Sequence, residues 1–241
     1  MKGCPSILCP IDYSEASVAA LRYAAALAEH FVTRSIVLNV EDPLFPSAMS
    51  LGTGAPWTRE MSEAEVAKFV SDVFDGDRGK LALYDYEVAV GKPSIEILRA
   101  ARERTCDLIV MSSHGLTGPR RMFFGSTTER VLRETAVPVL VTPPIDPGPV
   151  HIETAERVLG PIVVPLDLST ASRYQTQVAE GIAAALNLPI VFVHVIGPRM
   201  GSVTYRMLCL APMLVLALPT RLAVPATGHI AVTTESREAL A

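Results

Sequence analysis

Apolar stretches alternate with amphipathic ones along the first 142 residues of the chain. Residues 108–111 are a continuous apolar run, which is typical of a parallel strand covered on both faces. Similar patterns predict strands at 5–11, 35–40, 83–90, 107–112 and 138–142, and helices at 14–31, near 59–74, at 94–104 and at 126–135. This alternation of strand and helix predicts an α/β fold with a doubly wound, five-stranded parallel sheet.

The beginning of this pattern occurs twice in the chain. Residues 9–40 align without a gap on residues 164–195, at a constant offset of 155 residues. Asp12, for example, recurs as Asp167. In both segments an apolar strand leads to a helix and then to a second apolar strand, so the repeat predicts a partial second copy of the same domain.

The second copy is expected to be incomplete. At the same offset its glycine loop would lie near 267–281, beyond Ala241, so it would have no phosphate site. From about 199 the sequence contains no Asp or Lys, a composition that favours a shifted reading frame over a divergent segment that packs as an irregular layer. The predicted organisation is a complete domain at 1–142, a proline-rich linker at 143–158 and an incomplete second domain at 159–241.

Composition narrows the classes of function. A net charge of −4 and a pI near 5.8 give no basic surface, so we expect no nucleic-acid partner. The apolar run at 207–218 is shorter than the ~20 residues that span a bilayer, and we expect no membrane partner. The sequence shows no metal-ligand spacing, which predicts a protein without a metal of its own. It shows no apolar leader, and its cysteines form no paired pattern, which predicts a cytoplasmic protein (Cys4, Cys9, Cys106, Cys209).

Candidate chemistry follows the strand at 107–112. Gly125 precedes Ser126 and Thr127 at the start of a predicted helix, where unpaired backbone N–H groups favour an anion such as phosphate. Asp12 ends the first strand and would lie at the same edge of the sheet if the two strands are neighbours. A lone glycine loop is weak evidence, so the candidate site rests on this combination.

The chain resembles the universal stress protein family. The matching segments are PIDYSEAS at 10–17, GKPSIEIL at 91–98, and Gly115 and Gly125 separated by nine residues, with Ser126 following. Nucleotide-binding members of the family carry G-x2-G-x9-G-[S/T], and Ser112 stands where that motif has its first glycine. The resemblance implies an adenine-nucleotide alpha-hydrolase-like fold with strand order 3-2-1-4-5, which places Asp12 beside the loop after Ser112.

The resemblance also implies a site for ATP or a related adenine nucleotide, with Mg²⁺ carried by the phosphates. Asp12 and the backbone of Val40 would meet the adenine and ribose, and Gly115 and Gly125 would let the backbone approach the phosphates. The other candidate residues are Pro10, Ile11, Met111, Ser112, Ser126 and Thr127. If Ser112 must take a positive φ it costs about 1 kcal/mol, whereas in a β conformation it costs little, so we expect weakened rather than abolished binding.

Each candidate residue also has a structural interpretation. Asp12 would cap the helix that begins near Ser14, and the arginines at 120, 121, 130 and 133 would form a solvated face, which we favour over a role in holding a polyphosphate. His114 lies beside Ser113, but no orienting acid is evident, so loop packing is favoured over catalysis.

The leading hypothesis is a stress-response sensor or regulator that binds ATP and has at most weak ATPase activity. One alternative is a dimerising scaffold with an empty pocket, and another is a slow hydrolase or transferase that uses His114. Complete tandem members of the family resemble fused dimers that meet through their last strands. Without a second last strand, residues 137–141, from Val137 to Val141, would be an exposed apolar edge, which predicts a homodimer with a two-fold interface.

Overall fold

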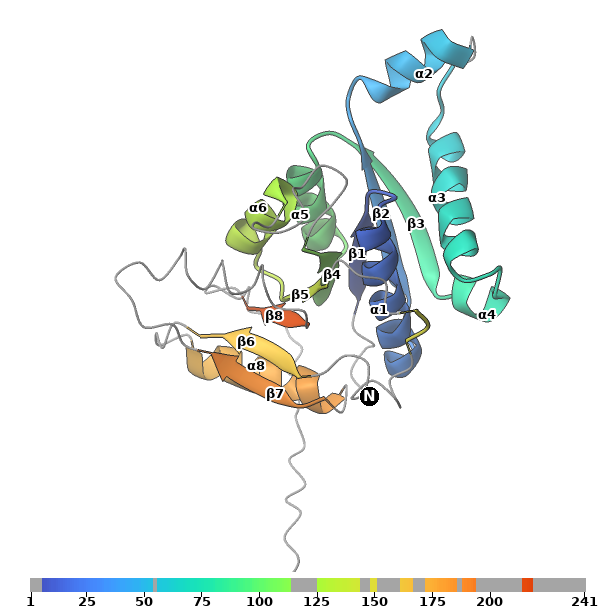
Figure 1. Cartoon of the computed structure of the whole chain (residues 1–241). Helices are drawn as coiled ribbons and strands as arrows, with labels where there is room; N and C mark the ends of the chain where they lie inside the picture. Colours follow the sequence, from blue (N-terminus) through green and yellow to red (C-terminus); the bar gives the residue numbers. More distant parts are fainter. Residues whose placement is uncertain are drawn as a thin grey trace, which may run out of the picture.

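The computed structural model describes residues 6–53, 56–113, 125–143, 148–150, 161–166, 172–185, 188–193 and 214–218. Within these residues the strands form one sheet in the order β3-β2-β1-β4-β5-β8-β6-β7 (Figure 1). The strands are β1 (Ile7–Ile11), β2 (Ser35–Glu41), β3 (Tyr84–Val90), β4 (Leu108–Ser112), β5 (Val139–Thr142), β6 (Ile162–Pro165), β7 (Ile190–Val193) and β8 (Val215–Ala217). The predicted order 3-2-1-4-5 is therefore confirmed, with parallel pairing throughout those five strands.

The helices of the N-terminal unit (residues 6–143) also follow the prediction. They are α1 (Glu15–Phe31), α3 (Arg59–Val73), α5 (Pro93–Glu103) and α6 (Ser126–Glu134), and each begins and ends within one residue of its predicted range. Two further helices, α2 (Phe45–Thr53) and α4 (Arg78–Leu81), were not predicted, because both are short and neither repeats an apolar face over several turns.

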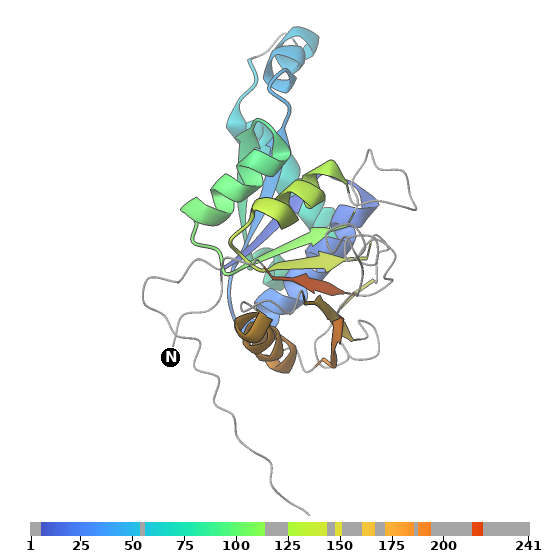
Figure 2. The same cartoon turned by 90° about the vertical axis from the view of Figure 1, so that its left-hand side faces the viewer.

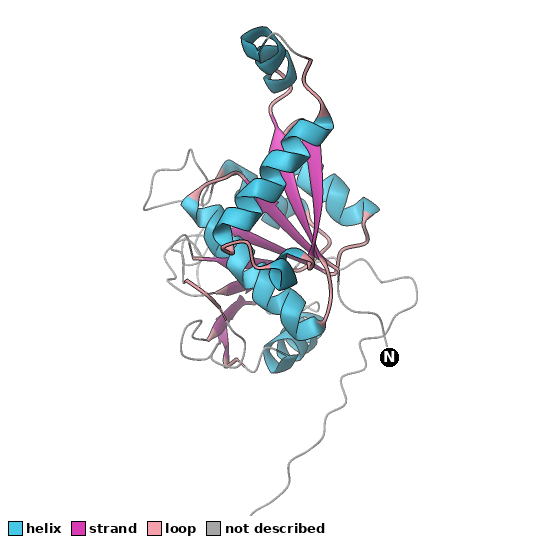
Figure 3. Ribbon diagram, turned by 90° about the vertical axis from the view of Figure 1, so that its right-hand side faces the viewer, coloured by secondary structure: helices cyan, strands magenta, loops and turns pink. Residues whose placement is uncertain are grey.

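Helices cover both faces of the sheet. One hydrophobic layer joins α1 and α3 to side chains such as Ile7 and Val37, and Figure 3 shows these helices in front of the sheet. The other layer joins α5 and α6 to side chains such as Leu8 and Ile109, and Figure 2 shows these helices on the opposite face. Buried alanines fill most of the inner face of α1, and their small side chains allow that helix to lie close to β1 and β4. The sheet therefore has a hydrophobic layer on each face, and the carboxyl ends of its parallel strands lie along one edge of both layers.

A C-terminal segment (described residues within 161–218) extends the same sheet. The strand β6, the helix α8 (Ser172–Ala185) and the strand β7 follow in the order that the repeat predicts. Ile162 pairs with Ile190 as Ile7 pairs with Ser35, so the registers of β6·β7 and β1·β2 share the offset found in the sequence. The domain boundaries themselves, and the interpretation of this segment as a second copy, stay predictions.

The prediction of an exposed edge at 137–141 is wrong. β8 pairs antiparallel with β5 along Val139, Leu140 and Val141, and all three side chains are buried. Sequence analysis missed this strand because it lies within the compositionally unusual tail. Residues 214–218 of that tail pack into the sheet, and the rest of the tail lies outside the described residues. Among the described helices, none combines the length and the apolar character needed to cross a bilayer.

Candidate functional site

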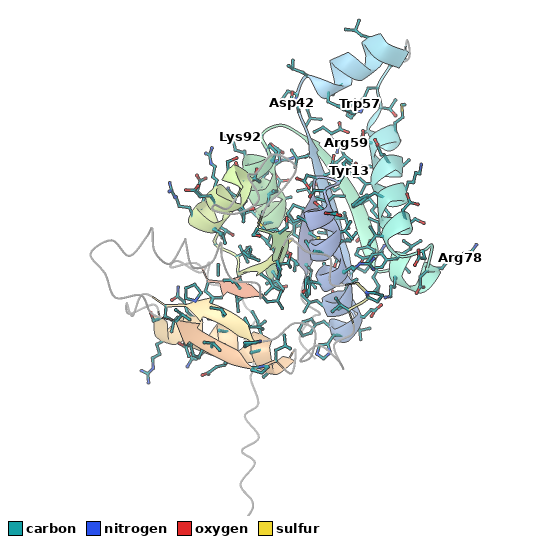
Figure 4. The ribbon with its side chains drawn as sticks, in the orientation of Figure 1. Tyr13, Asp42, Trp57, Arg59, Arg78 and Lys92 are labelled. Carbon is teal, nitrogen blue, oxygen red and sulfur yellow. The ribbon has the colours of Figure 1, made fainter. Side chains whose placement is uncertain are left out.

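The carboxyl ends of the central strands bring the candidate residues to one edge of the sheet. β1 and β4 are neighbours, with Ile7 opposite Leu108 and Leu8 opposite Ile109. Asp12 follows β1 directly, and Ser112 is the last residue of β4. α1 and α6 both begin at this edge. Figure 4 shows Tyr13, Asp42 and Lys92, which follow β1, β2 and β3, at this same end of the sheet.

Asp12 is held by the start of α1. Its Oδ1 atom accepts hydrogen bonds from the Ser14 backbone N–H, at 3.2 Å, and from the hydroxyls of Ser14 and Ser17. The Ser17 hydroxyl also accepts from the Asp12 backbone N–H, at 2.9 Å. The N-cap of α1 is Ser14, whose side chain accepts from the Ser17 N–H, so Asp12 does not cap the helix itself as the structural interpretation expected. Its carboxylate instead orders the turn that leads from β1 into α1. Sequence analysis missed Ser17, although that serine recurs in the repeated segment as Ser172.

Tyr13 completes this turn in a conformation that is rare for a residue with a side chain. Its φ of 61° lies in the left-handed region. Its ring meets the ring of Phe69 from α3 edge to face, with centroids 5.2 Å apart. Burial, with smaller contributions from the charges of Glu65 and Glu41, raises the pKa of Tyr13, so its phenol stays protonated at neutral pH.

The residues on either side of 114–124 are hydrogen-bonded to one another. The Gly125 N–H donates to the Ser113 carbonyl at 3.0 Å, and the buried Thr128 hydroxyl donates to the Ser112 carbonyl at 3.0 Å. The Ser113 N–H in turn donates to the Thr142 carbonyl at 3.2 Å. These bonds fix the start of α6 against the ends of β4 and β5. Sequence analysis missed this role of Thr128, since a threonine in the first turn of a helix carries no distinct signal.

The start of α6 has no side-chain cap. Gly125 is the N-cap residue, and in the described part of the chain no acceptor meets the backbone N–H groups of Ser126, Thr127 and Thr128. Gly125 has a φ of −57°, which any residue adopts, so the absence of a Cβ matters there only for close approach. Unpaired N–H groups and the helix dipole give this end of α6 a partial positive charge that attracts anions.

Ser112 adopts its place without backbone strain. Among the described residues, the non-glycine positions with positive φ are Tyr13, Val32, Asp75 and Thr105, so Ser112 keeps a negative φ as part of β4. Serine at this motif position therefore does not pay the energetic cost of a left-handed backbone conformation. This is the case in which the replacement of glycine by serine was expected to cost little.

The apolar candidates fall on two faces of the sheet. Met111 and Val40 belong to the layer under α5 and α6, and strand alternation places Pro10 on the same side as Leu8 in that layer. Ile11 belongs to the opposite layer, beneath α1 and α3. Its carbonyl accepts from the buried side-chain amide of Asn39, at 3.2 Å, a contact that sequence analysis did not foresee. Pro10, Val40 and Met111 thus share one face, while Ile11 supports the strand from behind.

The remaining candidates are a glycine, a histidine and four arginines. Gly115, His114 and the arginines at 120 and 121 lie outside the described residues. Arg130 pairs with Glu134 at 2.8 Å and Arg133 with Glu129 at 3.3 Å, both along α6. These partly exposed ion pairs support the interpretation of a solvated helix face. No cluster of metal-ligating side chains occurs within the described ranges.

Known proteins that are similar to this chain are universal stress proteins. The universal stress protein MJ0577 of Methanocaldococcus jannaschii is 28% identical over 149 residues, which cover 56% of this chain and 92% of that protein. YxiE, a universal stress protein of Bacillus subtilis, is 29% identical over 143 residues, which cover 56% of this chain and 96% of that protein.

A solved universal stress protein from Archaeoglobus fulgidus shares the fold, with 21% identity and a TM-score of 0.52 over 84% of this chain and 71% of that one. That likeness extends beyond the N-terminal unit. The pattern that defines the Universal stress protein family matches residues 5–143, which is more than half of the sequence. The chain therefore belongs to the universal stress protein family.

Proposed function

We propose that the N-terminal unit binds ATP or a related adenine nucleotide, and that the protein acts as a sensor or regulator in a stress response. The uncapped start of α6 carries this proposal, because it offers unpaired N–H groups beside Ser112, and the strand that ends at Ser112 is the neighbour of the strand that Asp12 follows. A helix start of this kind favours phosphate through both hydrogen bonds and the helix dipole. Ser126 and Thr127 add hydroxyl donors at the same place.

The remaining contacts of the nucleotide follow from the edge of the sheet. Adenine would lie at the ends of β1 and β2, against Pro10 and the backbone of Val40, whose side chains are partly buried on the face next to α5 and α6, while Met111 is buried behind them in the same layer. Asp12 and Ser112 end neighbouring strands and would meet the ribose hydroxyls. Gly115 and Gly125 would border the phosphates, and Mg²⁺ would arrive with them, held mainly by phosphate oxygens.

A scaffold without a ligand is the second candidate, and the Asp12 network favours it. Oδ1 of this carboxylate already serves the Ser14 and Ser17 donors that order α1, so Asp12 has a structural use without any nucleotide. In that case the fold would act through its surfaces alone. We also propose a cytoplasmic location, because the spacing of the cysteines in the sequence shows no pattern typical of disulfide-bonded proteins.

A calorimetric titration with ATP and Mg²⁺ separates the two candidates. Wild-type protein is compared with Gly125→Ala, which adds only a Cβ where the phosphates would approach, and with Gly52→Ala. A Cβ at Gly52 meets nothing within 4 Å, so that variant is a matched control in α2, outside the proposed contacts of the nucleotide. We expect wild type and Gly52→Ala to bind alike and Gly125→Ala to bind at least roughly tenfold more weakly, a loss of about 1.4 kcal/mol. Absence of heat in all three proteins would support the scaffold.

A further inference from the structure

Glu41 is a buried carboxylate without a hydrogen-bond partner. It is the last residue of β2 and is 9% exposed, and within the described part of the chain no donor meets its Oε2 atom. Its backbone is fixed, because its carbonyl accepts from the Gly91 N–H at 2.9 Å and it stands opposite Val90 of β3. An ionised carboxylate has only acceptor atoms, and burying it without a donor is costly. The nucleotide contacts proposed above make no use of this side chain.

Glu41 and Tyr13 lie near one another at the ends of neighbouring strands. Strand alternation places the Glu41 side chain on the same face of the sheet as Val37, beneath α1 and α3. Ile11 of β1 stands opposite Asn39 of β2, so Tyr13, two residues after Ile11, reaches the level of Glu41. The two residues are therefore brought together by the parallel pairing of β1 and β2.

The helix α3 supplies the other side chains of this group. The Tyr13 ring meets the Phe69 ring edge to face, with centroids 5.2 Å apart. Glu65 precedes Phe69 by one helical turn, on the same side of α3, and is exposed. Burial and, after it, the charges of Glu65 and Glu41 raise the pKa of Tyr13, so both carboxylates lie close enough to act on its hydroxyl. We call these four residues the Glu41 cluster (Tyr13, Glu41, Glu65, Phe69).

The Glu41 cluster contains two carboxylates and no basic side chain. A neutral donor would satisfy one oxygen atom and leave both charges uncompensated, whereas a cation offsets both. The ligand set does not suit a metal ion, because no group of three metal-ligating side chains occurs among the described residues. An ammonium or guanidinium group carries several N–H donors, and aromatic side chains such as those of Tyr13 and Phe69 attract it. An organic cation therefore matches the cluster in charge, in donors and in apolar contact.

We propose that the Glu41 cluster binds an organic cation, that is, an ammonium or guanidinium group on a short carbon chain. Glu41 accepts hydrogen bonds from the charged group, and Glu65 adds a second negative charge on the exposed side. The rings of Tyr13 and Phe69 contact the carbon chain. This site lies on the opposite face of the sheet from the Val40 side chain and does not depend on nucleotide binding.

Amide NMR of the full-length protein during titration with 1,4-diaminobutane tests this site. Wild type is compared with Glu41→Gln, which keeps the shape of the side chain and removes its charge, and with Glu60→Gln, which removes an exposed charge from the helix that carries Glu65. We expect saturable shifts at Tyr13, Glu41 and Phe69 in wild type and in Glu60→Gln, and at least roughly tenfold weaker binding in Glu41→Gln. Absence of saturable shifts in wild type, or equal affinity in a folded Glu41→Gln, would overturn the proposal.

Two further probes define the ligand. 1-Butanol has a carbon chain of the same length without a charge and should cause none of these shifts, so equal shifts with 1-butanol would contradict a cation site. Nα-acetyl-lysine amide presents its ammonium group as a protein side chain does. Tighter binding of this probe than of diaminobutane would assign the site to a lysine of a partner protein, and weaker binding would assign it to a free amine.

A second variant covers the case in which circular dichroism shows Glu41→Gln to be unfolded. Glu65→Gln then replaces it, because Glu65 is exposed on α3 and its loss leaves the core intact. This variant should bind diaminobutane about two- to fivefold more weakly than wild type, as expected for a partly screened charge. Unchanged affinity in Glu65→Gln would then contradict the proposal.

Discussion

A negative charge at the start of α6 should strengthen the fold and weaken nucleotide binding. Ser126 is the first residue of this helix and is exposed, so Ser126→Glu places a carboxylate beside the unpaired N–H groups without disturbing the core. Ser126→Gln has nearly the same shape and no charge, and the difference between the two variants isolates the electrostatic effect. The same pair of variants therefore measures the effect of the charge on the stability of the fold and on the affinity for nucleotide.

The size of each effect follows from the exposed position of Ser126. A carboxylate at a helix start contributes about 0.3–1 kcal/mol, and exposure favours the lower half of that range. Near a phosphate at a distance of about 5 Å, the same charge costs about 1–3 kcal/mol for an effective dielectric constant between roughly 80 and 20. The dissociation constant for ATP should therefore rise roughly 5- to 150-fold.

Thermal unfolding and ATP calorimetry of the two variants measure both effects. We expect the midpoint of unfolding to be about 1–2 °C higher for Ser126→Glu than for Ser126→Gln in the absence of nucleotide. Adding 0.5 M NaCl should reduce both differences, because exposed charges are screened. Equal affinity of the two variants for ATP, together with the higher midpoint for Ser126→Glu, would show that the phosphates do not bind at α6.

Three further predictions concern the groups around the site. Thr128→Val removes the hydrogen bond to the Ser112 carbonyl and should lower the unfolding free energy by about 1 kcal/mol and weaken ATP binding. Thr176→Val, which removes a bond within α8, should leave ATP affinity unchanged, and equal affinity in both variants would argue against a role for Thr128. Burial raises the pKa of Cys9 to about 12, so above pH 9 the unfolded chain loses a proton that the folded chain keeps. The unfolding free energy should then fall by up to about 1.4 kcal/mol per pH unit, and urea unfolding of Cys9→Ala should show a shallower fall. Mass spectrometry of small molecules released from purified protein should detect an adenine nucleotide, lost in Gly125→Ala.

Regular elements were predictable because their patterns are local. The runs that form β1 and β4 are apolar throughout or nearly so, β2 carries the apolar run at 36–38, and the stretches between the strands have lengths that suit crossover helices. β8 was not predictable, because three apolar residues in a Leu- and Ala-rich tail match many positions equally well. These three residues form a strand only because they pair with β5 and β6, and such long-range contacts produce no periodic pattern in the sequence.

The candidate site was predictable as a place but not as a set of contacts. The ends of β1 and β4 come together because parallel neighbours share an edge, which the order of elements already implies. The role of Asp12 was undecided, because a carboxylate after a strand suits both a helix start and a ligand contact, and only the structure shows its bonds to Ser14 and Ser17 and the capping role of Ser14. The negative φ of Ser112 likewise depends on how far β4 extends, which pattern analysis gives only to within a residue or two.

Amide NMR of the full-length protein during titration with ATP and Mg²⁺ tests whether the nucleotide binds at the ends of β1 and β4. We expect the largest shifts at Ser126, Thr127 and Gly125, with further shifts at Val40 and Ser112, while amides of α8 and β7 stay in place. Shifts absent up to millimolar ATP, or confined to the C-terminal segment, would contradict a nucleotide site at the ends of β1 and β4.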